Sequence, residues 1–89
     1  MVTTVRREAT SVTPRQLEVL TFLLRRERWS VGEVASALKV SSAAATKAIA
    51  RLERKGLVTR AVNMMDRRCV NVTVTPVGAE TARQTHKFA

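Results

Sequence analysis

The sequence of 89 residues is poor in aromatic side chains, in cysteine and in acidic residues. Two Phe, one Trp and no Tyr cannot supply the row of rings on which single-stranded nucleic acids stack. The one cysteine, Cys69, cannot form an internal disulfide, which fits a reducing compartment. No apolar run approaches the roughly 20 residues of a membrane span, and residues 1–13 lack the apolar stretch of a signal peptide. We therefore expect a cytoplasmic protein with no membrane partner.

The groups that carry catalysis or hold a cofactor are also missing. One histidine, His86, and one cysteine do not make a metal site. The sequence shows no nucleophile with a base beside it, no paired carboxylates and no glycine-rich phosphate loop. We expect no enzyme activity, no metal and no cofactor. Cys69 is interpreted as a small strand residue; the alternative, a redox sensor, would need a lowered thiol pKa, which Arg67 and Arg68 could supply.

Positive charge is what the sequence has in excess. Sixteen Lys and Arg stand against seven Asp and Glu, a net charge of +9. So basic a chain usually faces a polyanion: DNA, RNA, an anionic membrane surface or an acidic protein. The alternative is a merely solvated cationic surface. Hydrophobic residues make up 45% of the chain, which is typical of a globular protein, and the length predicts one domain.

Helix signals begin after a polar N-terminus, so we expect a flexible arm over residues 1–12 and one domain over residues 13–89. Thr13, Pro14 and Gln16 form a capping box with proline at the first helical position, and predict a helix to about Arg28. Its apolar residues span roughly 220° of the helical wheel at 100° per residue. A helix covered on one side needs only about 100°. We expect cover on two sides, by its own domain and by something else.

Two further helices follow closely. Ser30 and Glu33 form a second capping box, for a helix that ends near Lys39, and the preceding Trp29-Ser30 could form a brief strand. Ser41 caps a third helix, from Ser42 to Lys55, which ends at Gly56. Two short helices joined by so short a turn predict a helix-turn-helix.

After Gly56 the apolar period changes from 3.6 to 2. Strands from Leu57 to Val62 and from Cys69 to Thr75 flank a turn at Asn63 to Asp66, and Pro76 begins a last helix to about Lys87. The predicted fold is α+β, mostly α: a winged helix-turn-helix with a three-helix core, a two-stranded β-hairpin wing and a C-terminal helix.

The outward face of the third helix is small, hydroxylated and basic. Small residues let the backbone enter a major groove about 12 Å wide, where serine and threonine bond base edges or phosphates and lysine reaches guanine or phosphate. In the wing, arginines favour the narrow minor groove, and Asp66 is expected to pair with a neighbouring arginine and fix its direction. The alternative for the third helix is an ordinary solvated helix face. The alternative for Asp66 is a simple exposed turn residue. The candidate DNA-binding residues are Ser41, Ser42, Ala43, Thr46, Lys47, Arg51, Arg54, Arg60, Asp66, Arg67 and Arg68.

These residues, in this order, resemble the DNA-binding domain of the MarR family (multiple antibiotic resistance regulators). The resemblance implies that the stretch from Ser42 to Arg51 enters the major groove, and that Arg67 or Arg68 reaches the minor groove with Asp66 orienting an arginine. It also implies a transcriptional regulator, usually a repressor, that binds a palindromic site as a homodimer. The matching segments are Thr13 to Leu20, Glu33 to Ala35, Leu38 to Ser41, Thr46-Lys47, Ile49, Arg51 to Glu53, Lys55 to Val58, Asp66 to Arg68 and Val72 to Gly78.

The chain also departs from that family. Members usually carry a helix before this region and long helices after it, which build the dimer and border the effector pocket. About a dozen residues precede Thr13 and the last helix stops at Ala89. We therefore expect no effector pocket, and a homodimer whose dimerisation helices are short. Three alanines, from Ala43 to Ala45, replace larger residues and leave fewer base contacts.

The predicted function is a sequence-specific, double-stranded DNA-binding transcriptional regulator, a repressor of MarR-like type. Two alternatives stay open. The wide apolar arc of the first helix favours a protein-interaction module, and the alanine-rich face of the third favours an architectural DNA-binding protein of low specificity.

Overall fold

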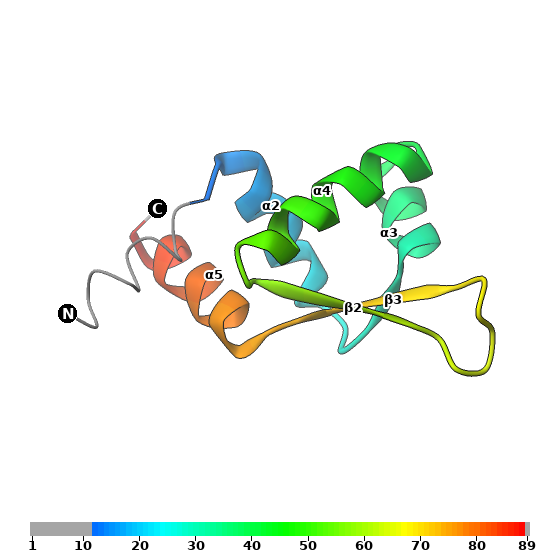
Figure 1. The fold of residues 1–89 in the computed structure, drawn as a ribbon. Helices are drawn as coiled ribbons and strands as arrows, with labels where there is room; N and C mark the ends of the chain where they lie inside the picture. Colours follow the sequence, from blue (N-terminus) through cyan, green and yellow to red (C-terminus); the bar gives the residue numbers. More distant parts are fainter. Residues whose placement is uncertain (1–11, 89) are drawn as a thin grey trace.

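The computed structural model describes residues 12–88 (Figure 1). Within that range four helices and a three-stranded antiparallel sheet form a mostly helical winged helix, as predicted. The strand order is β1-β3-β2. The elements are α2 (Pro14–Leu23), β1 (Trp29–Ser30), α3 (Val31–Leu38), α4 (Ser42–Arg54), β2 (Val58–Val62), β3 (Val70–Val74) and α5 (Pro76–Phe88). The arm predicted over residues 1–12 lies outside this range except for Val12, which packs against the core.

The helix starts follow from local hydrogen bonds. The Thr13 hydroxyl accepts from the Gln16 amide at 3.0 Å, and the Thr13 amide donates back to the Gln16 side chain at 3.1 Å. Ser30 and Glu33 repeat this exchange at the start of α3. The Ser41 hydroxyl accepts from the Ala44 amide at 3.0 Å and so begins α4. Each bond satisfies amides that have no partner within the helix, and all three predicted caps are confirmed.

The predicted end of the first helix, near Arg28, is wrong, because α2 ends at Leu23. The next amides turn to acceptors three residues back: Arg25 donates to Phe22 at 3.1 Å and Arg26 to Leu23 at 3.4 Å. The buried indole of Trp29 donates to the same Leu23 carbonyl at 2.9 Å. Trp29 also pairs with β3, so the chain must leave the helix axis before it. A long-range strand contact therefore overrides the local helix pattern.

The apolar face of α2 packs against other elements of this chain, and Arg15, Glu18 and Thr21 form its solvent face. Val19, Leu20 and Leu23 are buried, and α2 packs against α4, α5 and β3. Leu24, which is 42% exposed, lies beyond the helix end. Cover by its own domain is thus confirmed, with α5 as an element that the sequence pattern did not identify, and cover by something else stays a prediction. Of the wide apolar arc, Leu17 and Phe22 are half-buried.

The sheet joins the wing to the core. The hairpin pairs β2 with β3 from Val58↔Val74 to Val62↔Val70, and the brief strand anticipated at Trp29–Ser30 is β1. Ser30 lies opposite Asn71, so a third strand extends the two-stranded wing of the prediction. Val58 at the root is buried, whereas Val62 is 54% exposed. Figure 1 shows the hairpin extending beyond the helices at the end of the molecule where α4 begins.

Thr75 and Gly78 set the position of α5. The Thr75 hydroxyl donates to the Gly56 carbonyl at 2.8 Å and accepts from the Gly78 amide at 3.0 Å. The Thr75 amide donates to the Leu57 carbonyl at 3.0 Å. The Cα of Gly78 comes so close to Leu57 that a Cβ there would lie 2.1 Å from the Leu57 carbonyl oxygen. The first turn of α5 is therefore fixed against the start of the wing.

Candidate nucleic-acid interface

The packing of α4 decides which of its side chains face outward. Ala45, Ile49 and Leu52 are buried in the core. Their spacing of three to four residues places them on one face of the helix. The residues of the opposite face are exposed, as predicted: Ser42, Ala43, Thr46, Lys47, Arg51 and Arg54. The N-cap Ser41 is exposed as well. The helix therefore presents two hydroxyls, a small methyl group and three cations to solvent.

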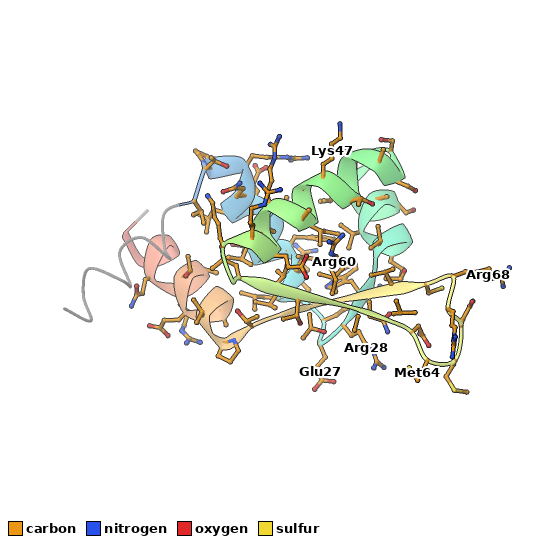
Figure 2. The ribbon with its side chains drawn as sticks, viewed as in Figure 1. Glu27, Arg28, Lys47, Arg60, Met64 and Arg68 are labelled. Atoms are coloured by element: carbon orange, nitrogen blue, oxygen red, sulfur yellow. The ribbon has the colours of Figure 1, made fainter. Side chains whose placement is uncertain are left out.

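Four cations of this surface have no hydrogen-bond or ion-pair partner among residues 12–88: Lys47, Arg51, Arg54 and Arg67. Figure 2 shows Lys47 projecting from α4 away from the body of the protein. A cation whose charge no carboxylate compensates keeps its full attraction for an external anion. The first three lie along α4 and the fourth lies at the wing tip, so the uncompensated charge spans both elements.

Arg60, predicted as a DNA-contacting cation of the wing, has an internal partner. Its Nε donates to Glu53 Oε1 at 2.9 Å, and its side chain is 33% exposed. The bond joins the middle of β2 to the last turns of α4, and Figure 2 places Arg60 between these elements. Arg60 therefore shares its charge with a carboxylate and links the root of the wing to α4. An exposed pair of this kind contributes about 0–1 kcal/mol.

The wing tip is organised by Asp66. Its Oδ1 accepts from the backbone amide of Arg68 at 3.1 Å and from the Arg68 guanidinium at 3.2 Å. The backbone bond, followed by the guanidinium bond, lowers the pKa of Asp66 below its ordinary value. The prediction that Asp66 pairs with a neighbouring arginine is confirmed, and that arginine is Arg68. Its side chain remains 91% exposed, so the pairing aims the guanidinium without covering it.

Cys69 is not primed for redox sensing. Its thiol donates to Asp66 Oδ2 at 3.6 Å, and the repulsion between that carboxylate and a thiolate is the main cause of a raised Cys69 pKa, followed by burial. Arg68 acts in the opposite direction but does not outweigh Asp66. The sensor hypothesis required a lowered thiol pKa, and the contact with Asp66 acts in the opposite direction. A thiol with a raised pKa stays protonated, and unreactive, at neutral pH.

A groove of about 410 Å³ separates the helix-turn-helix from the wing. It brings together four of the predicted residues: Ser42 and Thr46 from α4, and Arg60 and Arg68 from the wing. It is also lined by Ser30, Val31, Gly32, Cys69 and Val70. The sequence marked Ser30 as a helix cap but gave no reason to place it beside the wing. That placement follows from the pairing of Ser30 with Asn71, which are far apart in the chain.

Arg51 lies apart from this groove. It borders a smaller cleft of about 140 Å³ with Arg15 and Gln16 at the start of α2. Beside it, Lys55 Nζ donates to Gln16 Oε1 at 2.7 Å. Arg15 itself pairs with Glu18 at 3.0 Å. The basic surface of α4 thus continues onto α2, a neighbour that sequence reasoning did not include.

Among the side chains that the structure describes, residues 12–84, no group of three or more His, Cys, Asp and Glu is placed to hold a metal ion. No helix in the same range has both the length and the apolar character to cross a membrane. The surroundings of the His86 side chain lie outside what the structure describes.

The fold and the exposed surface together define a winged helix-turn-helix protein with a basic face on α4 and the wing. The sequence pattern of the MarR family matches residues 12–70, and the chain belongs to that family.

A curated relative is the HTH-type transcriptional repressor MdtR of Bacillus subtilis, 38% identical over 71 residues, which are 80% of this chain and 46% of MdtR. Among solved structures, a mutant MarR from E. coli has a TM-score of 0.80 at 32% identity and covers 86% of this chain. A mutant MarR from E. coli in complex with operator DNA has a TM-score of 0.81 at 29% identity and covers 93%. The chain spans about half the length of MdtR, and 57% and 61% of the two MarR chains.

Proposed function

We propose that this chain binds double-stranded DNA in a sequence-specific way and represses transcription. The observation that carries the proposal is the set of uncompensated cations on α4 and at the wing tip. MdtR bears the name of a transcriptional repressor, and the related MarR structure contains operator DNA. A regulator of transcription acts where the chromosome lies, so a cytoplasmic location and the absence of catalytic activity are part of this proposal.

In the proposed complex, the first turns of α4 enter the major groove. Ser42 and Thr46 offer hydroxyls to base edges, and Lys47 reaches guanine or phosphate. The methyl group of Ala43 suits contact with a thymine methyl group. The Ser41 hydroxyl already accepts a backbone bond, so its proton remains for a phosphate oxygen. Arg51 and Arg54, further along the helix, contact phosphates.

The wing supplies the second contact. Arg68, aimed by Asp66, and the unpaired Arg67 enter the minor groove, where the negative potential is concentrated. Arg60 holds the root of the wing to α4 through Glu53, so its proposed role is to position the wing. The groove between Thr46 and Arg68 then accommodates the sugar-phosphate strand that separates the two DNA grooves.

The test is a mobility-shift titration at several salt concentrations, on a duplex that the protein selects from a random-sequence pool. Each phosphate contact should contribute about −0.9 to the slope of log K against log salt. We expect a steep negative slope. Binding that does not depend on salt, or no binding to any duplex, would contradict the proposal.

The same titration on Arg67→Ala combined with Arg68→Ala tests the wing. We expect weaker binding and a shallower slope, with the melting temperature almost unchanged, because both side chains are exposed. Leu24→Gln, which replaces an exposed apolar side chain away from α4 and the wing, is the matched control and should bind as the wild type does. A large drop in melting temperature would show that the wing arginines are structural instead.

One observation favours a second candidate function. Ala43 and Ala44 lie exposed at the start of α4, where larger side chains would contact more base edges. A protein that binds chiefly phosphates and DNA shape would act as an architectural protein of low specificity. Competition between the selected duplex and random duplexes separates the two functions, because an architectural protein binds both about equally well. The contact of α5 with α2 covers part of the apolar arc that favours the interaction-module alternative.

A further inference from the structure

The wing tip carries apolar side chains that nothing in residues 12–88 covers. Met64 is 82% exposed, Met65 is 95% exposed, and Val62 beside them on β2 is 54% exposed. Within residues 12–84, the other large apolar side chains with such exposure are Leu24, just after α2, and Val77, on α5, and each stands alone. Three neighbouring apolar side chains at the end of a hairpin are therefore a distinct feature. Figure 2 shows Met64 at the tip, far from the helices.

The tip is held in shape from inside by hydrogen bonds. The Asn63 side-chain oxygen accepts from the Met65 amide at 2.8 Å and from the Asp66 amide at 3.2 Å. The Asn63 amide donates to the Cys69 carbonyl, and the Cys69 amide donates to the Asp66 carbonyl, both at 2.9 Å. These bonds use the polar groups of the turn and leave the two methionine side chains outside it. A preformed tip loses little conformational entropy on binding.

The charges around the tip indicate which partner it fits. Arg67 and Arg68 follow the methionines directly, and the acidic group among them, Asp66, is bonded to Arg68. An apolar point bordered by arginines complements a surface with anionic groups outside and apolar planes within. A DNA minor groove has this arrangement where a base step opens, because phosphates line its edges and the apolar faces of the bases lie between the steps of its floor. The tip lies at the end of the molecule where α4 begins, beside the groove shared by Thr46 and Arg68 (Figure 1).

We propose that Met64 and Met65 form an apolar wedge that enters the minor groove and partly unstacks one base step, next to the arginine contacts. The inference rests on the proposed DNA binding and adds a deformation of the DNA to it. Methionine is among the residues that DNA-bending proteins insert between base pairs, and its flexible thioether chain adapts to an irregular gap. Pyrimidine–purine steps unstack most readily. The wing therefore favours such a step at a position where no side chain reads a base edge.

The test is chemical footprinting of the selected duplex with the full chain bound. Permanganate oxidises unstacked thymines, and diethyl pyrocarbonate modifies unstacked purines. We expect wild-type protein to create reactive bases at the step that the wing contacts. Met64→Gln with Met65→Gln keeps side-chain length but removes apolar character, and should abolish this reactivity. Met64→Leu with Met65→Leu is the matched control and should retain it, as should Val77→Gln, an apolar-to-polar change on α5.

Affinity gives a second measurement. Met64→Gln with Met65→Gln should weaken binding to the selected duplex by roughly ten- to hundredfold. This is the factor expected when one or two methionine side chains lose their burial in the complex. The salt slope should stay unchanged, because no phosphate contact is lost. Met64, Met65 and Val77 are all exposed, so the variants should fold normally.

Three outcomes overturn the wedge. The first is a bound duplex in which no base becomes reactive with the protein present. The second is base reactivity that persists with Met64→Gln and Met65→Gln. The third is a loss of reactivity with Met64→Leu and Met65→Leu equal to that with the glutamine substitutions. In each of these the DNA still binds, so the proposed function stands while the wedge fails. Failure of the wild-type protein to bind any duplex would remove both.

Discussion

A single carboxylate organises the tip of the wing. Asp66 accepts from the backbone and the guanidinium of Arg68 and from the thiol of Cys69. Its lowered pKa keeps it ionised through mildly acidic conditions. The stabilisation that depends on its charge is present above its ordinary pKa of 3.8 and is lost as the pH falls through its lower folded value. The geometry of the arginines at the tip should therefore hold across the physiological pH range.

The thiol of Cys69 reports this arrangement. In Asp66→Asn the charge that repels a thiolate is gone, so the Cys69 pKa should fall and alkylation by iodoacetamide should begin at a lower pH than in the wild type. The measurement is the alkylation rate as a function of pH. Arg68→Ala is a control of opposite sign, because Arg68 lowers the Cys69 pKa and its loss should move the midpoint upward. An Asp66→Asn midpoint equal to or above that of the wild type would contradict this account of the site.

At the scale of the elements, what matters is how the wing and α5 are fixed to the helical core. β1 pairs with β3, Arg60 links β2 to Glu53 of α4, and Thr75 bonds to Gly56. Gly78 completes these contacts, because its Cα approaches the backbone of Leu57. A backbone contact cannot move aside as a flexible side chain can. The tightest constraint in this region is therefore a position where only a hydrogen atom fits.

Gly78→Ala tests that constraint. A Cβ there would lie 2.1 Å from the Leu57 carbonyl oxygen and 2.9 Å from its carbon, so α5 must shift away from the wing. We expect a loss of about 3 kcal/mol or more, and for a domain of this size a fall in melting temperature of more than about 12 °C. Thermal unfolding followed by circular dichroism gives the value.

Gly32→Ala is the matched control for Gly78→Ala. A Cβ at Gly32 meets its nearest atom at 3.9 Å, an ordinary contact, and the residue lies in α3. Alanine favours the helix there, so the stability of this variant should be unchanged or slightly raised. Similar melting temperatures for the two variants would show that the close approach of Gly78 does not hold α5 in place.

Much of this fold could be predicted, and the reasons differ between elements. The starts of α2, α3 and α4 follow from Thr13, Ser30 and Ser41, because a cap acts within three residues of itself. The hairpin follows from the alternating valines of β3, because the side chains of a strand point alternately to its two faces. The end of α2 could not be predicted, since it depends on the pairing of Trp29 with Val72.

At the scale of the whole molecule, the number of chains that act together determines how many bases are read. A single chain offers one α4 and one wing, and the exposed residues at the start of α4 include two alanines. One such surface reads few bases, whereas two copies on a palindromic site double the contacts and fix their spacing. We therefore propose that specific binding requires a homodimer.

Sedimentation at micromolar protein concentration, with and without the selected duplex, tests the dimer. We expect two chains per duplex and a palindromic sequence in the selected site. Met64→Gln with Met65→Gln should leave this stoichiometry unchanged, because the wedge is proposed to contact DNA and not a second chain. One chain per duplex on a site without symmetry would contradict the proposal and favour the architectural function.

The sequence by itself determined the class of fold, the outward face of α4 and the excess of positive charge. Helix caps and apolar periodicity act over a few neighbouring residues, and the net charge is the sum of the charged side chains. It also predicted the pairing of Asp66 with an arginine, which lies two residues away. The tertiary structure decided which cations stay uncompensated, that Arg60 is bound to Glu53, and that Ser30 lines the groove. It also decided that the Cys69 pKa rises, although two arginines precede Cys69 in the chain. These properties depend on which groups come within hydrogen-bond distance in the folded chain, and the order of residues alone does not specify that.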